Sequence, residues 1–277
     1  MKKHTNIVDF KWLKVGYCVQ SEHFSLSNAP FRKKRFYATV GVIYHTNGIY
    51  LYDTGYSSEF YKQTKKFPFS LYAKSVPVFY QKDNSLIKQL SELGIQKEDI
   101  KGIILSHFHA DHIAGLKELP SVPIYVFKKC YKQIRHKSGI RAALSGFVPN
   151  LLPTDFEKRV ILLEDNQKAD ISLKPFEKMT DILNDGSLFA VCLDGHADGQ
   201  LGLYINMDKP VFLISDASWS SEGFKKNILP PWYVRFFLGN NKAYQKTLEK
   251  IYQFHLLNKD VLILPSHCSE YWEKKNV

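Results

Sequence analysis

The chain has 277 residues, and 44% of them are hydrophobic, which is enough apolar material for a packed globular core. A net charge of +11 favours anionic partners, but the densest basic run, residues 32–35, is too short to indicate a nucleic-acid-binding protein. No apolar run reaches the roughly 18 residues of a membrane span, so we expect no transmembrane segment. No apolar stretch follows the N-terminal lysines, so we expect no secretory signal. The predicted location is therefore the cytoplasm.

The predicted elements begin with a hairpin. Apolar and aromatic runs at residues 37–45 and 48–53 flank a Thr-Asn-Gly turn signal. A helix is predicted from Asn84, which can cap its start, to Gly94, because leucine and isoleucine side chains recur there at helical spacing. A short buried strand at residues 103–105 follows this helix.

Further strands and one longer helix continue the pattern. Strands are predicted at residues 122–127, 159–163, 188–193, 201–205, 211–214 and 261–264. Residues 241–257 are predicted as a helix with one apolar face. No repeat and no Gly-, Ser- or Pro-rich linker divides the chain, so we expect a single domain over residues 1–277. Strands with helices between them are typical of an α/β or α+β layered domain.

The four cysteines give no site of their own. Cys18, Cys130, Cys192 and Cys268 are far apart and form no CxxC pair, which argues against a cysteine zinc site and against a disulfide framework. Free cysteine is among the most buried residue types, so we expect reduced, buried thiols.

The densest group of metal-ligand residue types follows the predicted strand at 103–105. Residues 106–112 read Ser-His-Phe-His-Ala-Asp-His, so three imidazoles and one carboxylate fall within six positions. If His107 and His109 extend the strand, their spacing points both to one face, and a turn can present Asp111 and His112 to a second ion. Any single histidine is more often structural, but this cluster favours metal binding.

Three more residues follow predicted strands in the same way. His196, Asp216 and His267 each come just after an apolar run, so they can reach one edge of the sheets. A carboxylate such as that of Asp216 can bridge two cations about 3.5–4 Å apart. The remaining histidines lack such a setting and are predicted to be surface or packing residues: His4, His23, His45, His136 and His255.

On these residues the chain resembles the metallo-β-lactamase-fold hydrolases, whose HxHxDH signature is intact here. The resemblance implies a four-layer αβ/βα sandwich with two divalent metal ions, expected to be Zn²⁺, at one edge. It implies one ion held by His107, His109 and His196, another held by Asp111, His112 and His267, and Asp216 bridging them. Asp53 lies in a segment that resembles the family's LxDTG element and would orient a ligand; the alternative is a plain turn aspartate.

Within the superfamily the sequence is most similar to the N-acyl-homoserine lactonases, which quench bacterial quorum sensing. Asp216 argues against the antibiotic-degrading β-lactamases, which have a cysteine at this place. Two positions depart from the lactonase pattern. Trp219 stands where the best-known lactonases have a substrate-binding tyrosine, and an indole can donate a hydrogen bond but cannot accept one. Gln200 replaces the second histidine of the family's GHxxGH element.

The resemblance implies hydrolysis of a lactone or ester, with an N-acyl-homoserine lactone as the expected substrate. The metals would polarise the carbonyl, a bridging hydroxide would attack it, and Asp111 would bring a proton to the leaving alkoxide. Trp219 is the candidate substrate contact. The alternatives are a metal-dependent phosphodiesterase or nuclease of the same fold, and a non-enzymatic binding protein.

Two aromatic clusters, residues 67–72 and 230–237, fall in irregular stretches. They could line a groove for an acyl chain, but such clusters more often belong to a core or a subunit interface, which is the interpretation we favour and which allows a homodimer. The expected partner is a small-molecule lactone or ester, and nucleic acid is not expected.

Overall fold

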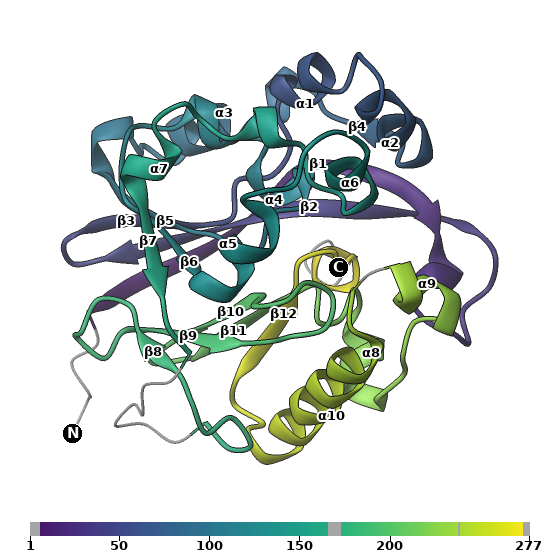
Figure 1. The fold of residues 1–277 in the computed structure, drawn as a ribbon. Coiled ribbons are helices and arrows are strands. Elements are labelled where there is room, and N and C mark those ends of the chain that lie inside the picture. Colours follow the sequence, from purple (N-terminus) through teal and green to yellow (C-terminus); the bar gives the residue numbers. More distant parts are fainter. Residues whose placement is uncertain (1–5, 166–172, 238, 274–277) are drawn as a thin grey trace.

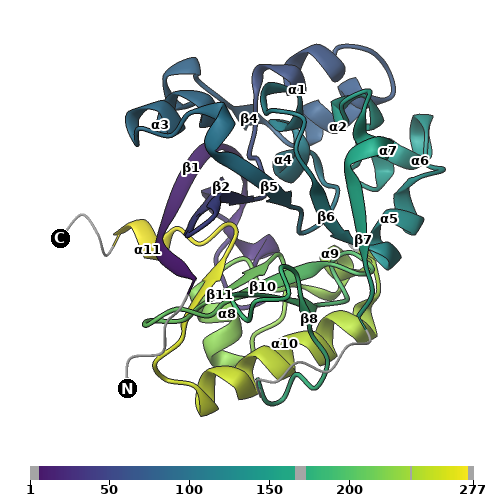
Figure 2. The same cartoon turned by 90° about the vertical axis from the view of Figure 1, so that its left-hand side faces the viewer.

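Two mixed sheets face each other between layers of helices in the computed structural model, which describes residues 6–165, 173–237 and 239–273. The larger sheet has the strand order β4-β1-β2-β3-β5-β6-β7 and the smaller one the order β12-β11-β10-β9-β8. Helices cover the outer face of each sheet (Figures 1 and 2). The four-layer αβ/βα sandwich is therefore confirmed.

The larger sheet joins antiparallel strands β4, β1, β2 and β3 to parallel strands β5, β6 and β7. Its strands are β1 (Ile7–Ser21), β2 (Lys33–His45), β3 (Gly48–Tyr52), β4 (Val78–Phe79), β5 (Ile100–Ile104), β6 (Ile124–Phe127) and β7 (Val160–Leu163). The predicted hairpin is confirmed, because β2 pairs with β3 and His45 lies opposite Gly48.

The smaller sheet is antiparallel except for the parallel pair of β11 and β12. Its strands are β8 (Thr180–Asp181), β9 (Leu188–Cys192), β10 (Leu201–Ile205), β11 (Val211–Ser215) and β12 (Leu262–Pro265). The last four match predicted strands to within one residue at each end.

Short helices cover the larger sheet, and one long helix covers the smaller. The α-helices are α1 (Ser58–Gln63), α2 (Phe69–Ser75), α3 (Leu86–Glu92), α4 (Ala110–Ile113), α5 (Lys128–Ile134), α6 (Gly139–Leu144), α7 (Phe156–Arg159), α8 (Ser221–Lys226), α9 (Trp232–Phe237), α10 (Asn241–Leu257) and α11 (Glu270–Glu273). Single 3₁₀ turns lie at Glu22–Phe24, Lys82–Asn84, Lys97–Asp99, Leu116–Glu118 and Pro149–Leu151. Helix α10 has the predicted bounds.

The predicted cap of α3 is wrong by one residue. The Ser85 hydroxyl accepts a hydrogen bond from the backbone N–H of Lys88, while Asn84 belongs to the preceding 3₁₀ turn. Gly94 does follow the helix with φ of +75°, a left-handed conformation that suits glycine at a helix end.

Two apolar clusters hold the layers together. One fills the space between the sheets and under the upper helices, with Ile103 and Leu203 among its fully buried members. The other lies between the smaller sheet and α10, where the rings of Phe212 and Phe254 are 5.2 Å apart. Because both faces of the smaller sheet are packed, the residues that follow its strands have fixed positions. Among the described residues, no helix combines the length and apolarity needed to cross a bilayer.

Candidate metal centre

Polar side chains from four strand ends meet between the two sheets. His107 follows β5, His196 follows β9, Asp216 follows β11 and His267 follows β12. All four are buried, with at most 6% of their surface exposed. The sequence separates these residues by up to 160 positions, and the two packed sheets bring them together, as predicted.

The segment after β5 differs in detail from the prediction. The strand ends at Ile104, and His109 occupies the N-cap position of the short helix α4. Asp111 and His112 therefore project from a helical turn rather than from an irregular one. The outcome is the same, since all four polar side chains of the segment reach the centre.

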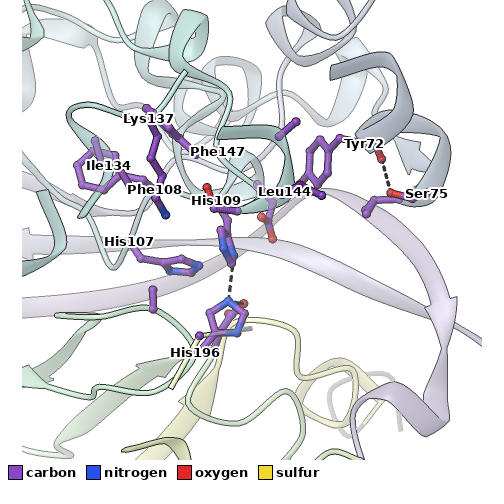
Figure 3. Close-up of a pocket in the computed structure, with 18 of the residues that line it drawn as sticks. Tyr72, Ser75, His107, Phe108, His109, Ile134, Lys137, Leu144, Phe147 and His196 are labelled. Atoms are coloured by element: carbon purple, nitrogen blue, oxygen red, sulfur yellow. Dashed lines mark hydrogen bonds and ion pairs between the residues drawn. The ribbon is translucent and has the colours of Figure 1, made fainter. Parts of the chain in front are cut away.

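Seven side chains form two groups that could each hold a metal ion. His107, His109, His196 and Asp216 offer ligand atoms within 4.8 Å of one another, and so do Asp111, His112 and His267. In the first group, Nδ1 of His109 lies 2.9 Å from Nε2 of His196, and Figure 3 shows the imidazoles of His107, His109 and His196 converging.

Asp216 lies between the two groups. Its Oδ2 is 3.3 Å from Nε2 of His196 and 3.2 Å from Nε2 of His267. Its Oδ1 is 3.7 Å from Nε2 of His112. One carboxylate thus faces imidazoles of both groups, which is the arrangement needed for a bridging ligand.

Neighbouring acceptors fix the orientation of two imidazoles. Nδ1 of His112 lies 2.8 Å from Oδ2 of the buried Asp53, and Nδ1 of His267 lies 2.7 Å from the backbone carbonyl of Tyr37. A carboxylate or a carbonyl can only accept, so each Nδ1 carries the proton. In the neutral imidazole this leaves the lone pair on Nε2, and both Nε2 atoms face the centre.

Asp53 is held in turn by Ser106. The backbone N–H and the hydroxyl of Ser106 donate to the two oxygens of Asp53, over 2.7 and 2.8 Å. Asp53 has φ of +61°, an unusual conformation for a side-chain-bearing residue, and it is fully buried. The contact with His112 favours the orienting role over a plain turn aspartate.

The donor set fits divalent metal ions. Nε2 of His107, Nε2 of His112 and Oδ1 of Asp216 are buried and have no hydrogen-bond partner. Leaving such atoms unsatisfied is unfavourable, so a ligand that accepts their lone pairs is expected. Imidazole nitrogen and carboxylate oxygen are ligands that suit zinc and related divalent ions.

Burial and charge put several groups in the form that binds metal. Burial lowers the pKa of His107 well below its usual value and that of His196 to about 3, so both imidazoles are neutral near pH 7. Burial would raise the pKa of Asp111, but the neighbouring His112 and His267 together lower it to about 2. Burial would lower the pKa of His112, but the carboxylates of Asp111, Asp53 and Asp216 together raise it. A metal ion at this imidazole would therefore compete with a proton.

A glycine that the sequence did not single out supports His109. Gly146 has φ of +65°, and a Cβ added there would lie 2.8 Å from Cδ2 of His109. Its carbonyl accepts the backbone N–H of Ala110, at the start of α4. Only a residue without a side chain fits this approach, and the sequence contains no local signal for it because the contact is between distant segments.

A cavity of about 1510 Å³ leads to the centre. Asp111, Trp219 and five of the six other predicted site residues line it, together with apolar side chains of α2, α6 and α9. Phe67 and Tyr72 of the first aromatic cluster and Tyr233 and Phe236 of the second lie in its wall. These four residues line a groove, which was the alternative interpretation; Tyr72 also packs against the core cluster, and the subunit interface stays a prediction.

The remaining histidines and the cysteines can be compared with their predictions. His136 is exposed, as predicted for a surface residue, and it also lines the cavity. His45 is a packing residue, buried against Asp185 at 2.8 Å. His4 lies outside the described residues. The four cysteines are free thiols, and three of them are buried, as expected; Cys192 is half-buried.

The two departures from the lactonase pattern lie close to the centre. The ring of Trp219 is 5.8 Å from that of His196 and 6.3 Å from that of His267, and its Nε1 is buried without a partner. Gln200 is fully buried and its Oε1 has no partner. Trp219 therefore has a free donor beside the centre, whereas Gln200 lies in the supporting loop.

The comparisons with known proteins agree with this geometry. The family model described as "Metallo-beta-lactamase superfamily" matches residues 34–199. N-acyl homoserine lactonase AttM of Rhizobium radiobacter is 22% identical over 69% of this chain and 66% of its own length. AiiB of Agrobacterium fabrum, also an N-acyl homoserine lactonase, is 27% identical over 76% of this chain and 71% of its own length. The chain thus spans just under two thirds of the first of these relatives.

Solved structures show the same fold. An N-acyl homoserine lactone hydrolase with the product N-hexanoyl-L-homoserine at its catalytic metal centre superposes with a TM-score of 0.74, at 18% identity, over 98% of this chain and 97% of its own. A variant of AiiA from B. thuringiensis with N-decanoyl-L-homoserine bound gives a TM-score of 0.73 at 17% identity, with coverage of 98% and 97%. The fold expected from the sequence is confirmed.

Proposed function

Because the chain belongs to the metallo-beta-lactamase superfamily, we propose that it is a dinuclear metal-dependent hydrolase that opens a lactone or ester, with an N-acyl-homoserine lactone as the substrate. The observation that carries the proposal is the convergence of two ligand groups on one carboxylate at the floor of an apolar cavity. The relatives named as lactonases support the choice of substrate.

In this proposal the seven side chains hold two divalent ions. His107, His109 and His196 hold one, and Asp111, His112 and His267 hold the other. Asp216 binds both. When bound, two such ions lower the pKa of water and polarise a carbonyl oxygen. Zn²⁺ is the ion proposed, because neutral imidazoles and carboxylates make up the whole ligand set.

The chain's own residues orient the substrate and move the proton. Asp111 lines the cavity, so its carboxylate can take up the proton of the attacking water and release it to the leaving alkoxide oxygen. Trp219 also lines the cavity, and its Nε1–H is buried without a partner, so it is the candidate donor to an oxygen of the substrate. Asp53 and the Tyr37 carbonyl hold two imidazoles in the required tautomer.

The apolar wall is suited to an acyl chain. Phe67, Leu71, Ile140 and Leu144 line the cavity away from the ligands, and an acyl chain placed among them would leave the reacting carbonyl at the polar floor. Hydrolysis of such a signal molecule would make the protein a quorum-quenching enzyme. The proposed location is the cytoplasm, where cysteines without disulfide partners are the rule. A homodimer stays a prediction.

Metal analysis combined with a hydrolysis panel tests the proposal. The panel contains acyl-homoserine lactones of graded chain length, simple lactones, a phosphodiester and a β-lactam. We expect about two equivalents of zinc per chain and turnover of acyl lactones. Turnover of the phosphodiester alone would replace the lactonase by the phosphodiesterase or nuclease, and an inert metal-loaded protein would support a binding role.

A further inference from the structure

The cavity opens to solvent between α2, α6 and α9, and its rim is apolar. Five large apolar side chains both line the cavity and are more than half exposed: Phe67 (67%), Leu71 (58%), Ile140 (55%), Leu144 (79%) and Phe236 (72%). Trp232, which is 70% exposed, extends the rim on α9. Exposed side chains that also line a cavity mark its opening, and we call these six residues the mouth (α2, α6 and α9 in Figure 1).

In α6 the mouth residues project outward because the other face of the helix is packed. In α6, Ala142 and Ala143 are buried while Ile140 and Leu144 are exposed. Helix α2 lies beside α6, so exposed apolar residues of both helices border the same opening. A cluster of this kind, assembled from separate segments, is unusual on a soluble surface and marks a binding site.

The segments that carry the mouth contain no acidic residue, and two of them, residues 65–75 and 131–146, hold seven lysines and arginines, whereas residues 228–240 hold only Arg235. Residues 65–75, 131–146 and 228–240 hold none of the chain's 27 Asp and Glu residues. Lys128 and Lys129, just outside them, pair with Glu164 and Asp194. Within the described part of the chain, none of the eight Lys and Arg residues of the segments forms such an ion pair: Lys65, Lys66, Lys74, Lys132, Arg135, Lys137, Arg141 and Arg235.

We propose that the mouth docks on an anionic lipid surface. Apolar side chains at its rim would enter the boundary between headgroups and acyl chains, and the surrounding lysines and arginines would face lipid phosphates. A second copy of the chain fits less well, because a two-fold contact would place this basic face against itself. The proposal goes beyond the hydrolase function and does not depend on it.

Docking in this orientation has a consequence for the cavity. Its opening would face the apolar layer, while the candidate metal ligands form a buried part of its wall. An acyl chain could then pass from the bilayer into the cavity without crossing water. The short helices would insert only superficially, as interfacial segments do.

Vesicle flotation with the metal-loaded protein tests the proposal. One set of vesicles contains phosphatidylcholine alone, and the other contains equal parts of phosphatidylcholine and phosphatidylglycerol. We expect the protein to float with the second set and to dissociate as the salt concentration is raised, because screening weakens the attraction.

Three variants separate the contributions. L71S/L144S removes apolar side chains from the mouth, and K132E/R135E reverses two exposed charges outside the cavity wall. L257S is the matched control, because Leu257 is 67% exposed on α10, which covers the other sheet (Figure 1). Each double variant should bind anionic vesicles at least about tenfold more weakly, and L257S should bind like the wild type.

Absence of wild-type binding to the anionic vesicles would overturn the proposal, and so would equal binding by all variants. Sedimentation velocity adds a further outcome. If the wild type is a dimer that L71S/L144S separates, and vesicles are not bound, the mouth is occupied by a second copy. Circular dichroism and metal content establish that each variant is folded.

Discussion

The candidate metal centre and the mouth belong to one cavity, and their residues are held in different ways. The ligands follow strands of two packed sheets, and most of their polar atoms face a partner or one another. Five of the six mouth residues belong to short helices of six or seven residues, Phe67 lies just before α2, and all six are largely exposed. Helices this short depend on packing for their stability. The candidate ligands thus lie on the rigid part of the fold, and the mouth lies on the part that tolerates change.

Removal of the shared carboxylate should give the largest effect. Asp216→Ala leaves imidazoles of both groups without the anion that lies 3.2–3.7 Å from them. Loss of a bridging ligand should abolish tight binding of at least one ion and lower hydrolysis by about 10³-fold or more. Metal content per chain and kcat/KM are the measurements.

The control for this variant is Asp208→Ala, at an exposed position. It should keep both metal content and activity. Wild-type metal content in Asp216→Ala would show that metal binding does not require Asp216. The metal centre would then not be more sensitive to substitution than the mouth.

The next effect should come from a residue that touches no metal. Asp53→Asn removes the charge that holds Nδ1–H of His112, at 2.8 Å in the buried site. Loss of such an orienting carboxylate lowers metal affinity by about 10–100-fold. Titration with a competing chelator measures this affinity. Asp83→Asn, at an exposed aspartate, is the control, and equal affinities in the two variants would assign Asp53 a purely structural role.

A smaller effect is expected behind His109. In Gly146→Ala the new methyl group would lie 2.8 Å from the His109 ring, so the ring must shift. A displacement of a few tenths of an ångström should lower kcat by about tenfold. Gly186→Ala is a matched control, because Gly186 also has a positive φ, of +77°, but has no neighbour within 4 Å. If both variants lose activity equally, backbone strain and not the contact with His109 is responsible.

The candidate metal centre could be predicted because histidine and aspartate are residue types that bind metal ions. Histidine and aspartate after apolar strands indicate ligands wherever the strands lie, and all seven predicted residues meet. The supporting contacts could not be predicted in this way. Tyr37 contributes a backbone carbonyl and Gly146 the absence of a side chain, and neither property leaves a pattern in the sequence.

The secondary structure, like the site, could be predicted only in part. Strand β1, the longest, was not predicted, because its register with β2 shifts between Ile7 and Asp9 and between Lys14 and Tyr17. Gly16, with φ of +85°, lies at the second shift. Such bulges interrupt the alternation of apolar and polar residues by which a strand is recognised. The unbroken helical period of α10, in contrast, gave its bounds correctly.

The smallest predicted effect tests whether the mouth acts independently of the centre. Leu144→Ala removes a side chain that lines the cavity and is 79% exposed, so it has apolar surface left for an acyl chain to cover. Partial burial of one leucine contributes on the order of 1 kcal/mol, which corresponds to roughly fivefold in kcat/KM. The loss should appear with long-chain acyl lactones and not with short ones, whose chains end before the mouth. Metal content should stay at the wild-type value, and Leu257→Ala should match the wild type on both substrates. A loss that is the same for all chain lengths, or a fall in bound metal, would mean that the mouth and the centre are one coupled unit.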